Sequence, residues 1–154
     1  MDAEIEMYLR VIEGGLASVL RCLHGLDEGA IRWNPLPSAN SLASIARHSL
    51  ANAERNVLGT FAGEPYTWQR DQEFLTDQET VETLRATWQL LDGRMRQALE
   101  SMPAPTLATT REHPRMGSVS GRAVLLRAAC HASEHRGEAE LTGGLVVARA
   151  PQAE

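Results

Sequence analysis

The sequence predicts an all-α fold, an antiparallel four-helix bundle that forms a single domain over residues 1–154. Four segments carry apolar side chains three or four residues apart, the spacing that lines one face of an α-helix. Stretches that contain proline or glycine separate these segments, and both residue types interrupt or weaken helices. No segment alternates polar and apolar residues with a period of two, so no sheet is expected.

The first helix is predicted over residues 1–26, where six apolar residues recur at intervals of four and three. These residues are Ile5, Leu9, Ile12, Leu16, Val19 and Leu23. Gly14 and Gly15 lie within this helix, where each costs about 1 kcal/mol relative to alanine. We interpret the pair as a point of close contact with another helix. The run Asp27-Glu28-Gly29 is expected to end the helix.

The second helix is expected to begin after Asn40 or Ser41, because either residue is a good N-cap. It runs to about Phe61, and Gly63 and Pro65 then stop it. Its inner side is formed by Leu42, Ile45, Ala46, Ser49, Ala53 and Val57.

The third helix follows a connection over residues 62–76 and is expected to be capped by Asp77. Its apolar stripe consists of Val81, Leu84, Trp88, Leu91, Met95 and Leu99. Pro103 and Pro105 end this helix. Residues 103–119 then form a second long loop, and loops of that length are often functional.

The fourth helix begins near Ser120, and Gly143-Gly144 is expected to provide its C-terminal cap. Its inward positions are Val124, Ala128, His131, His135 and Glu138. Two histidines therefore lie on a stripe whose other members are predicted to be buried.

Composition and charge exclude several classes of function. The formal net charge of −5 favours solubility and argues against a surface for nucleic acid or anionic membrane. No apolar stretch approaches the roughly 20 residues that span a bilayer. The acidic start, Met1-Asp2-Ala3-Glu4, has no secretory signal, and Cys22 and Cys130 form no disulfide framework. We therefore expect a cytoplasmic protein.

His131 and His135 are four residues apart, so their imidazoles lie about 40° apart around the helix and face the same way. The same spacing supplies two histidine ligands in helical zinc motifs. A buried imidazole is costly unless it is paired, and a shared cation would pair both. The alternative is a pair of histidines at the edge of the core that are satisfied by hydrogen bonds.

His48 lies in the middle of the second helix, on the same side as Ile45 and Asn52. In an antiparallel bundle it can meet the middle of the fourth helix. Three neutral imidazoles with an open fourth position form the ligand set of a catalytic zinc site. We interpret His24 and His113 as surface histidines, with His113 a distant candidate for lining a pocket.

His131, Glu134 and His135 also match the HxxEH signature of inverted zinc proteases, in which the glutamate is the general base. Such proteases are much longer than this chain. Glu134 is also about 60° from His131, on the side away from His135. We interpret it as a solvated or interhelical charge.

Other residues have simpler interpretations. Arg127 and Arg136 are candidates to hold an anionic substrate near a metal, the alternative being solvated positions on the helix. Cys130 is expected to be a small buried apolar side chain. Trp33 and Trp68 lie in connections, where they pack beneath loops or wall a pocket mouth.

Two segments resemble the DinB/YfiT-like family. The run from His131 to Glu138, His-Ala-Ser-Glu-His-Arg-Gly-Glu, is similar to its HxxxHRGQ motif. Trp33-Asn34-Pro35-Leu36-Pro37, followed by an Asn-Ser cap and by His48 seven residues after Ser41, resembles the entry to its second helix. The helix order and spacing of nearly the whole chain agree.

The resemblance implies a four-helix bundle, often dimeric, that binds a divalent metal, zinc or nickel, through His48, His131 and His135. It also implies a small-molecule substrate, since characterised members include transferases and isomerases that use low-molecular-weight thiols such as mycothiol or bacillithiol. The chain lacks the extra C-terminal domain of the mycothiol-dependent isomerases, so that isomerisation is not expected. A homodimer is predicted.

Glu138 departs from the family, which usually has glutamine there. Its carboxylate is a candidate hydrogen-bond acceptor beside a ligand, fourth ligand or partner for an arginine, and Asn52 and Arg136 are further candidates near the site. The favoured function is a metal-dependent S-transferase that acts on a metal-activated thiol. The alternatives are a metal-dependent hydrolase, in which water takes the thiol's place, and a non-catalytic metal-binding or structural dimeric bundle.

Overall fold

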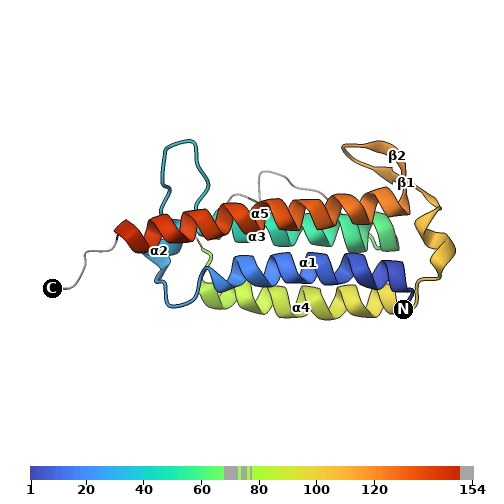
Figure 1. Cartoon of the computed structure of the whole chain (residues 1–154), viewed down its shortest axis with the longest axis horizontal. Helices are drawn as coiled ribbons and strands as arrows, with labels where there is room; N and C mark the ends of the chain where they lie inside the picture. The colour runs from blue at the N-terminus through green and yellow to red at the C-terminus, as the bar shows by residue number, and fades with distance from the viewer. Residues whose placement is uncertain (68–72, 74–75, 77, 150–154) are drawn as a thin grey trace.

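The chain folds into the expected bundle of long helices in a computed structural model that describes all residues except 68–72, 74–75, 77 and 150–154. The bundle consists of α1 (Ala3–Arg21), α3 (Leu42–Ala53), α4 (Val81–Glu100) and α5 (Gly121–Arg149), and α3 continues directly into the π-helix η1 (Glu54–Ala62). These helices lie side by side along the long axis of the molecule (Figure 1). The predicted four-helix bundle is confirmed.

The direction of the helices gives the bundle its topology. Helices α1 and α5 run one way, and α3 with η1 and α4 runs the other way (Figure 1). Helix η1 ends at the far end of the bundle from the start of α4 (Figure 1). The middle of α3 therefore lies antiparallel to the middle of α5, as the sequence predicts for the histidines.

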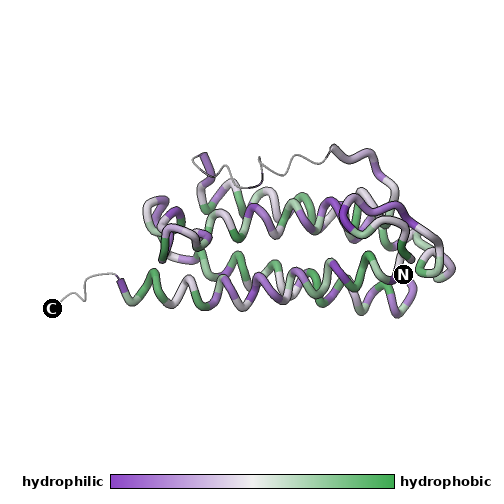
Figure 2. The backbone as a smooth tube through the Cα atoms, turned by 90° about the horizontal axis from the view of Figure 1, so that it is seen from above, coloured by the Kyte–Doolittle hydropathy of each residue, from purple (hydrophilic) through white to green (hydrophobic). Residues whose placement is uncertain are grey.

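The apolar stripes form the core. Figure 2 shows hydrophobic and hydrophilic residues alternating around the long helices. Fully buried side chains include Ile5, Leu9, Ile12, Leu16, Val19, Leu42, Leu58, Phe61, Leu84 and Val124. Gly15 confirms the expected close helix contact, since a Cβ there would lie 2.8 Å from the carbonyl oxygen of Ala132 in α5. Gly14 does not, because a Cβ at that position would meet nothing within 4 Å.

Helix ends follow local capping chemistry. Ser41 caps α3 and accepts a hydrogen bond from the Ser44 backbone N–H, while Gly63 ends η1 with a left-handed φ of 81°. Thr80 caps α4 in a reciprocal capping box with Thr83. The predicted cap, Asp77, lies outside the described residues, and Thr80 holds the capping position in its place.

The connection after α1 differs from the prediction. Helix α1 ends at Arg21, and the run that was expected to end it begins a short helix instead, α2 (Glu28–Arg32). The Asp27 side chain caps α2 by accepting from the Ala30 N–H at 2.8 Å. Trp33 follows, packed against the core, with the Arg149 guanidinium 4.9 Å from its ring centre. The other tryptophan expected in a connection, Trp68, is outside the described residues.

The expectation of no sheet was wrong. After the short 3₁₀ helix η3 (Ala104–Leu107), the strands β1 (Thr110–His113) and β2 (Gly117–Ser120) form an antiparallel hairpin. Each strand has four residues, too few for an alternating pattern to stand out in the sequence. Gly117 supplies the left-handed φ of 68° that the turn into β2 requires.

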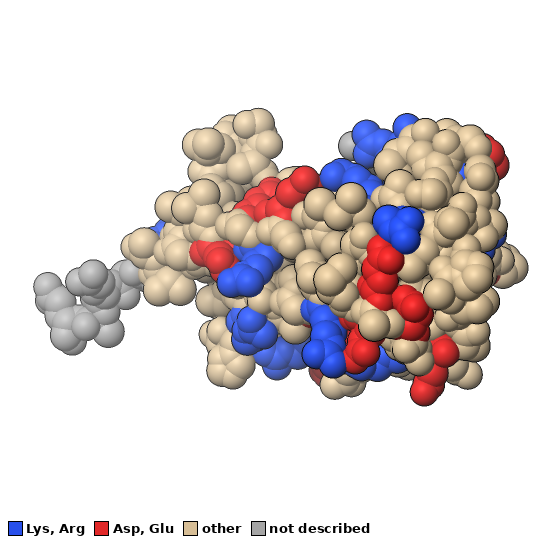
Figure 3. Space-filling view, turned by 45° about the vertical axis from the view of Figure 1, so that its right-hand side comes forward, with Lys and Arg blue, Asp and Glu red and all other residues tan. Residues whose placement is uncertain are grey.

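Helix α5 is longer than predicted, because it continues through Gly143 and Gly144 to Arg149. Thr142 and Val146 are buried on either side of the glycines, so packing holds this turn despite the weak helix propensity of glycine. Among the described residues, no helix is both long and apolar enough to cross a bilayer. The face in Figure 3 carries acidic and basic side chains close together.

Candidate metal centre

Three histidines from two antiparallel helices meet inside the bundle. His48 lies on α3, and His131 and His135 lie one turn apart on α5. Their ring centres are 4.9 Å (His48 to His131), 5.1 Å (His48 to His135) and 4.3 Å (His131 to His135) apart. One potential ligand atom from each residue lies within 4.8 Å of the other two. The structure thus brings together the three residues that the sequence selects.

Carboxylates fix the outer nitrogens of two of these rings. The Nδ1 atom of His48 is 2.7 Å from Glu73 Oε2, and the Nδ1 atom of His135 is 2.6 Å from Glu138 Oε2. Because a carboxylate oxygen accepts, each Nδ1 carries the proton and each Nε2 keeps its lone pair. The Nε2 atoms of His48 and His131 face each other at 3.1 Å. Such an arrangement presents neutral nitrogen donors to one point.

The electrostatics of the centre favour neutral imidazoles. Burial, together with the neighbouring rings of His135 and His48, lowers the pKa of His131 to about 2. Burial also lowers the pKa of His48, although its hydrogen bond to Glu73 opposes that shift. A cation can bind imidazole nitrogens only when they are unprotonated, so at neutral pH both rings are in the form that binds a metal.

Comparisons with known proteins identify the family and related folds. A family model described as mycothiol-S-transferase matches residues 8–145. The chain belongs to this family. The DinB/YfiT-like resemblance in the sequence is thereby confirmed. No curated protein is significantly similar to the chain in sequence.

Solved structures share the fold at low sequence identity. A conserved protein from Enterococcus faecalis has a TM-score of 0.76 and 14% identity, covering 97% of this chain and 99% of that one. A DinB-like protein from Bacillus cereus has a TM-score of 0.71 and 17% identity, covering 97% of both chains. YfiT from Bacillus subtilis, described as a probable metal-dependent hydrolase with an unusual four-helix bundle topology, has a TM-score of 0.68 and 13% identity, covering 96% and 90%.

Glu138, the residue at which the sequence departs from the family motif, contacts His135 and one other side chain. Its Oε1 accepts from Asn40 Nδ2 at 3.0 Å, while Oε2 faces the histidine. No arginine pairs with it among the described residues. Of the three roles considered for Glu138, these contacts match the hydrogen-bond acceptor beside a ligand.

Glu73 and Arg55 are parts of the centre that sequence reasoning missed. Glu73 comes from the connection before α4, and its Oε1 accepts from Arg55 Nη1 at 3.1 Å. Both side chains are buried, at 5% and 3% exposed. Arg55 follows His48 by seven residues and so shares its helix face, a signal that the sequence does contain. Nothing in the sequence marks Glu73.

The remaining predicted residues lie farther out. Asn52 is buried, but its side-chain oxygen accepts from Asn56 Nδ2 at 2.9 Å. The guanidinium of Arg136 is exposed and pairs with Glu140 at 2.8 Å, which is the solvated helix position that was the alternative to holding an anion. Glu134 is a solvated charge, as predicted, 3.5 Å from Arg127.

His113 and Cys130 differ from their interpretations. His113 is only 6% exposed rather than a surface residue, because its Nε2 donates to Asn56 Oδ1 at 2.9 Å. Its Nδ1 accepts from the backbone N–H groups of Arg115 and Met116, so the ring fastens the hairpin to η1. Cys130 is exposed rather than buried. His24 is exposed, as expected.

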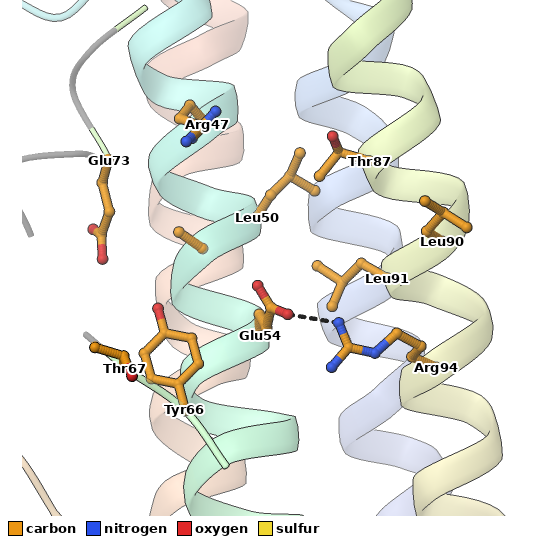
Figure 4. Close-up of a pocket in the computed structure, with 11 residues that line it drawn as sticks. Arg47, Leu50, Glu54, Tyr66, Thr67, Glu73, Thr87, Leu90, Leu91 and Arg94 are labelled. Atoms are coloured by element: carbon orange, nitrogen blue, oxygen red, sulfur yellow. Dashed lines mark hydrogen bonds and ion pairs between the residues drawn. The ribbon is translucent and has the colours of Figure 1, made fainter. Parts of the chain in front are cut away.

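A cleft of about 420 Å³ lies between α3, η1 and α4, beside the centre. Leu50 and Leu91 line its floor, and Tyr66 points toward it from the connection (Figure 4). Glu73 also lines this cleft, so a single carboxylate borders both the cleft and the histidine centre.

Proposed function

We propose that this protein is a divalent-metal-dependent S-transferase that acts on a low-molecular-weight thiol. The observation that carries the proposal is the convergence of three imidazoles, two of which have their Nδ1 atoms fixed by carboxylates. The match to the mycothiol-S-transferase family supports the choice of a thiol as substrate.

The donor set fits a divalent cation. A tetrahedral zinc site with nitrogen ligands at roughly 2.0–2.1 Å separates those ligands by about 3.3 Å. The observed separation of 3.1 Å between the Nε2 atoms of His48 and His131 is close to that value. Three neutral nitrogens leave one position of the tetrahedron for a substrate, and imidazole also suits nickel. We propose His48, His131 and His135 as the ligands.

The protein's own groups prepare the reaction. A bound cation would supply the Lewis acidity that lowers the pKa of a thiol, so that the thiolate exists at neutral pH. The three rings, at 6–16% exposed, hold their nitrogens in a poorly solvated site. Glu73 and Glu138 keep the Nδ1 protons of their histidines in place. The thiolate sulfur then attacks an electrophilic substrate, and the leaving group departs with the electron pair of the broken bond.

The test is a titration of the Co²⁺-loaded protein with mycothiol, bacillithiol and glutathione. A thiol that binds through sulfur is expected to add a sulfur-to-cobalt charge-transfer band in the near ultraviolet. His24→Ala, at an exposed position, should behave as wild type. If the protein binds Co²⁺ but no thiol adds the band, the proposal that the protein acts on a metal-bound thiol is wrong. Ester or amide hydrolysis by the same protein would then favour the hydrolase, in which water is activated.

We also propose a homodimer in the cytoplasm. Large apolar side chains remain exposed on the adjacent helices α1 and α5, among them Met7 at 53%, Val11 at 44% and Leu141 at 69%. A two-fold pairing would cover them. Both cysteines are free, which suits a reducing compartment. Light scattering that gives a monomer mass at micromolar concentration would rule out the dimer.

A further inference from the structure

The two carboxylates that contact the histidines are held in different environments. Glu138 lies on the same helix as His135, three residues away, and its side chain is 36% exposed. Glu73 comes from a different segment of the chain than His48, and its side chain is 5% exposed. Water can therefore replace part of what Glu138 does, but it has little access to Glu73.

Glu73 also contacts the buried guanidinium of Arg55. One of its oxygens is 2.7 Å from His48 Nδ1, and the other is 3.1 Å from Arg55 Nη1. The Glu73 carboxylate thus lies between the guanidinium of Arg55 and His48, a proposed metal ligand. In a buried site, where charges are weakly screened, a guanidinium at this distance opposes the binding of a divalent cation unless an anion lies between them.

We infer that Glu73 is a positioning residue that orients His48 and shields the metal centre from the charge of Arg55. The inference rests on the proposed metal site and assigns a second task to the carboxylate. Its hydrogen bond holds the Nδ1 proton of His48, so that Nε2 points to the centre. Its charge offsets the guanidinium that would otherwise raise the local potential.

The position of Glu73 in the fold allows this arrangement. In Figure 4, Glu73 lies beside α3, on the connection rather than on another helix of the bundle. His48 and Arg55 are seven residues apart, so they lie on the same face of the continuous helix formed by α3 and η1. One carboxylate can therefore bridge both residues.

The inference predicts a particular order of metal affinities. Glutamine keeps one oxygen that can accept from Nδ1–H and replaces the other with an NH2 group. Glu73→Gln and Glu138→Gln can therefore each keep the hydrogen bond to histidine, while both lose the charge and the second acceptor, which faces Arg55 in one case and Asn40 in the other. Glu73→Gln should weaken Co²⁺ binding roughly 10- to 100-fold, within the range for residues that support metal ligands. Glu138→Gln, the matched control, should weaken it less than about tenfold, because its site is partly solvated.

Arg55 supplies the decisive variants. Arg55→Gln removes the opposing cation and leaves the carboxylate, so it should bind Co²⁺ as tightly as wild type or more tightly. The double variant Glu73→Gln/Arg55→Gln should regain a large part of the affinity that Glu73→Gln loses. If Arg55 and Glu73 merely hold the fold together, Arg55→Gln would instead weaken binding as Glu73→Gln does, and the shielding role would be wrong.

The experiment measures Co²⁺ affinity by competition with a chelator and records the d–d spectrum of each loaded variant. Far-UV circular dichroism of the metal-free proteins shows whether each variant is folded. If Glu73→Gln is not folded, Arg55→Gln and the double variant still decide the test. No Co²⁺ binding by wild type would overturn the metal site and this inference together. Tight binding by wild type, with equal losses in Glu73→Gln and Glu138→Gln, would overturn only the role of Glu73.

Discussion

His131 is the histidine most completely enclosed by the other two. Its ring centre lies 4.9 Å from that of His48 and 4.3 Å from that of His135, and it is only 6% exposed. Without a cation, the rings gain little from one another, because burial disfavours the charged forms of His48 and His131 and neutral rings share few donors. The centre is thus organised for a ligand rather than for the stability of the helices.

His131→Ala is accordingly expected to abolish tight binding of zinc and nickel and to leave a folded protein. The apolar stripes of four helices form the core, and His131 is not a member of that apolar cluster. His24→Ala should change neither property. Metal content by elemental analysis and helicity by circular dichroism check both variants. Loss of metal from His24→Ala with retention by His131→Ala would show that the ligands are wrongly assigned.

A partly buried acid that lies remote from the histidines has a raised pKa. Glu13 on α1 pairs with Arg96 of α4 at 2.5 Å, and its side chain is 12% exposed. Burial raises its pKa to about 7, the attraction of Arg96 opposes the shift, and the neighbouring Asp92 carboxylate adds to it. The folded protein therefore binds this proton more tightly than the unfolded chain does.

Glu13 therefore makes a contribution to the stability of the fold that decreases as pH rises. A raised pKa in the folded state stabilises the fold at low pH, and this contribution is lost as pH increases through about 7. Glu13→Gln mimics the protonated acid at every pH. Its melting temperature, relative to wild type, should thus be higher at pH 8 than at pH 5. Glu6→Gln, at a half-exposed position on the same helix, is the control. An equal offset for Glu13→Gln at both pH values would contradict the assignment.

The histidines could be predicted from the sequence because each lies on a helix whose apolar rhythm fixes its direction. Glu73 could not, because it lies in a connection where no periodicity relates it to α3. His113 was misread for the same reason, since only the folded hairpin brings it to Asn56. Helix faces are local properties of the chain, whereas the contacts of a connection depend on where the long elements place it.

At the scale of elements, the close approach of α1 and α5 depends on one of two adjacent glycines. A Cβ on Gly15 would lie 2.8–2.9 Å from the backbone carbonyl and the Cβ of Ala132, and no flexible side chain is there to yield. A Cβ on Gly14 would lie in open space. The same residue type occupies both positions, but only Gly15 is in close contact with another helix.

Gly15→Ala should therefore destabilise the protein by about 1–3 kcal/mol, because α1 and α5 must move apart to admit the methyl group. Gly14→Ala should stabilise it by up to about 1 kcal/mol, since alanine is the better helix former. Urea denaturation of the two variants measures both changes. Equal effects of the two substitutions would mean that the helices do not meet at Gly15.

The elements that were not predicted from the sequence are those whose structure depends on tertiary contacts. The hairpin has strands of four residues, and its attachment depends on the buried His113. The last turns of α5 contain two glycines and persist because Thr142 and Val146 are packed. The long helices, by contrast, carry their apolar stripes in the sequence, and those stripes determine the four-helix bundle.

For the whole molecule, the proposed metal site joins segments that are distant in sequence. His48 belongs to α3, and the other two histidines belong to α5, 83 residues farther on for His131. The unfolded chain does not hold these three side chains together, so a cation binds the folded state preferentially. Binding then stabilises the bundle by mass action, by about 2.7 kcal/mol at a free metal concentration of 100 times Kd.

Metal loading should thus raise the melting temperature by roughly 5–10 °C, given the usual 2–4 °C per kcal/mol for a domain of this size. The measurement is a pair of thermal melts, one with saturating zinc and one with chelator, on wild type and His131→Ala. The chelator should lower the midpoint of wild type, and His131→Ala should melt at one temperature in both conditions. If zinc is shown to leave the wild-type protein and the midpoint does not change, then metal binding is not coupled to the association of α3 with α5.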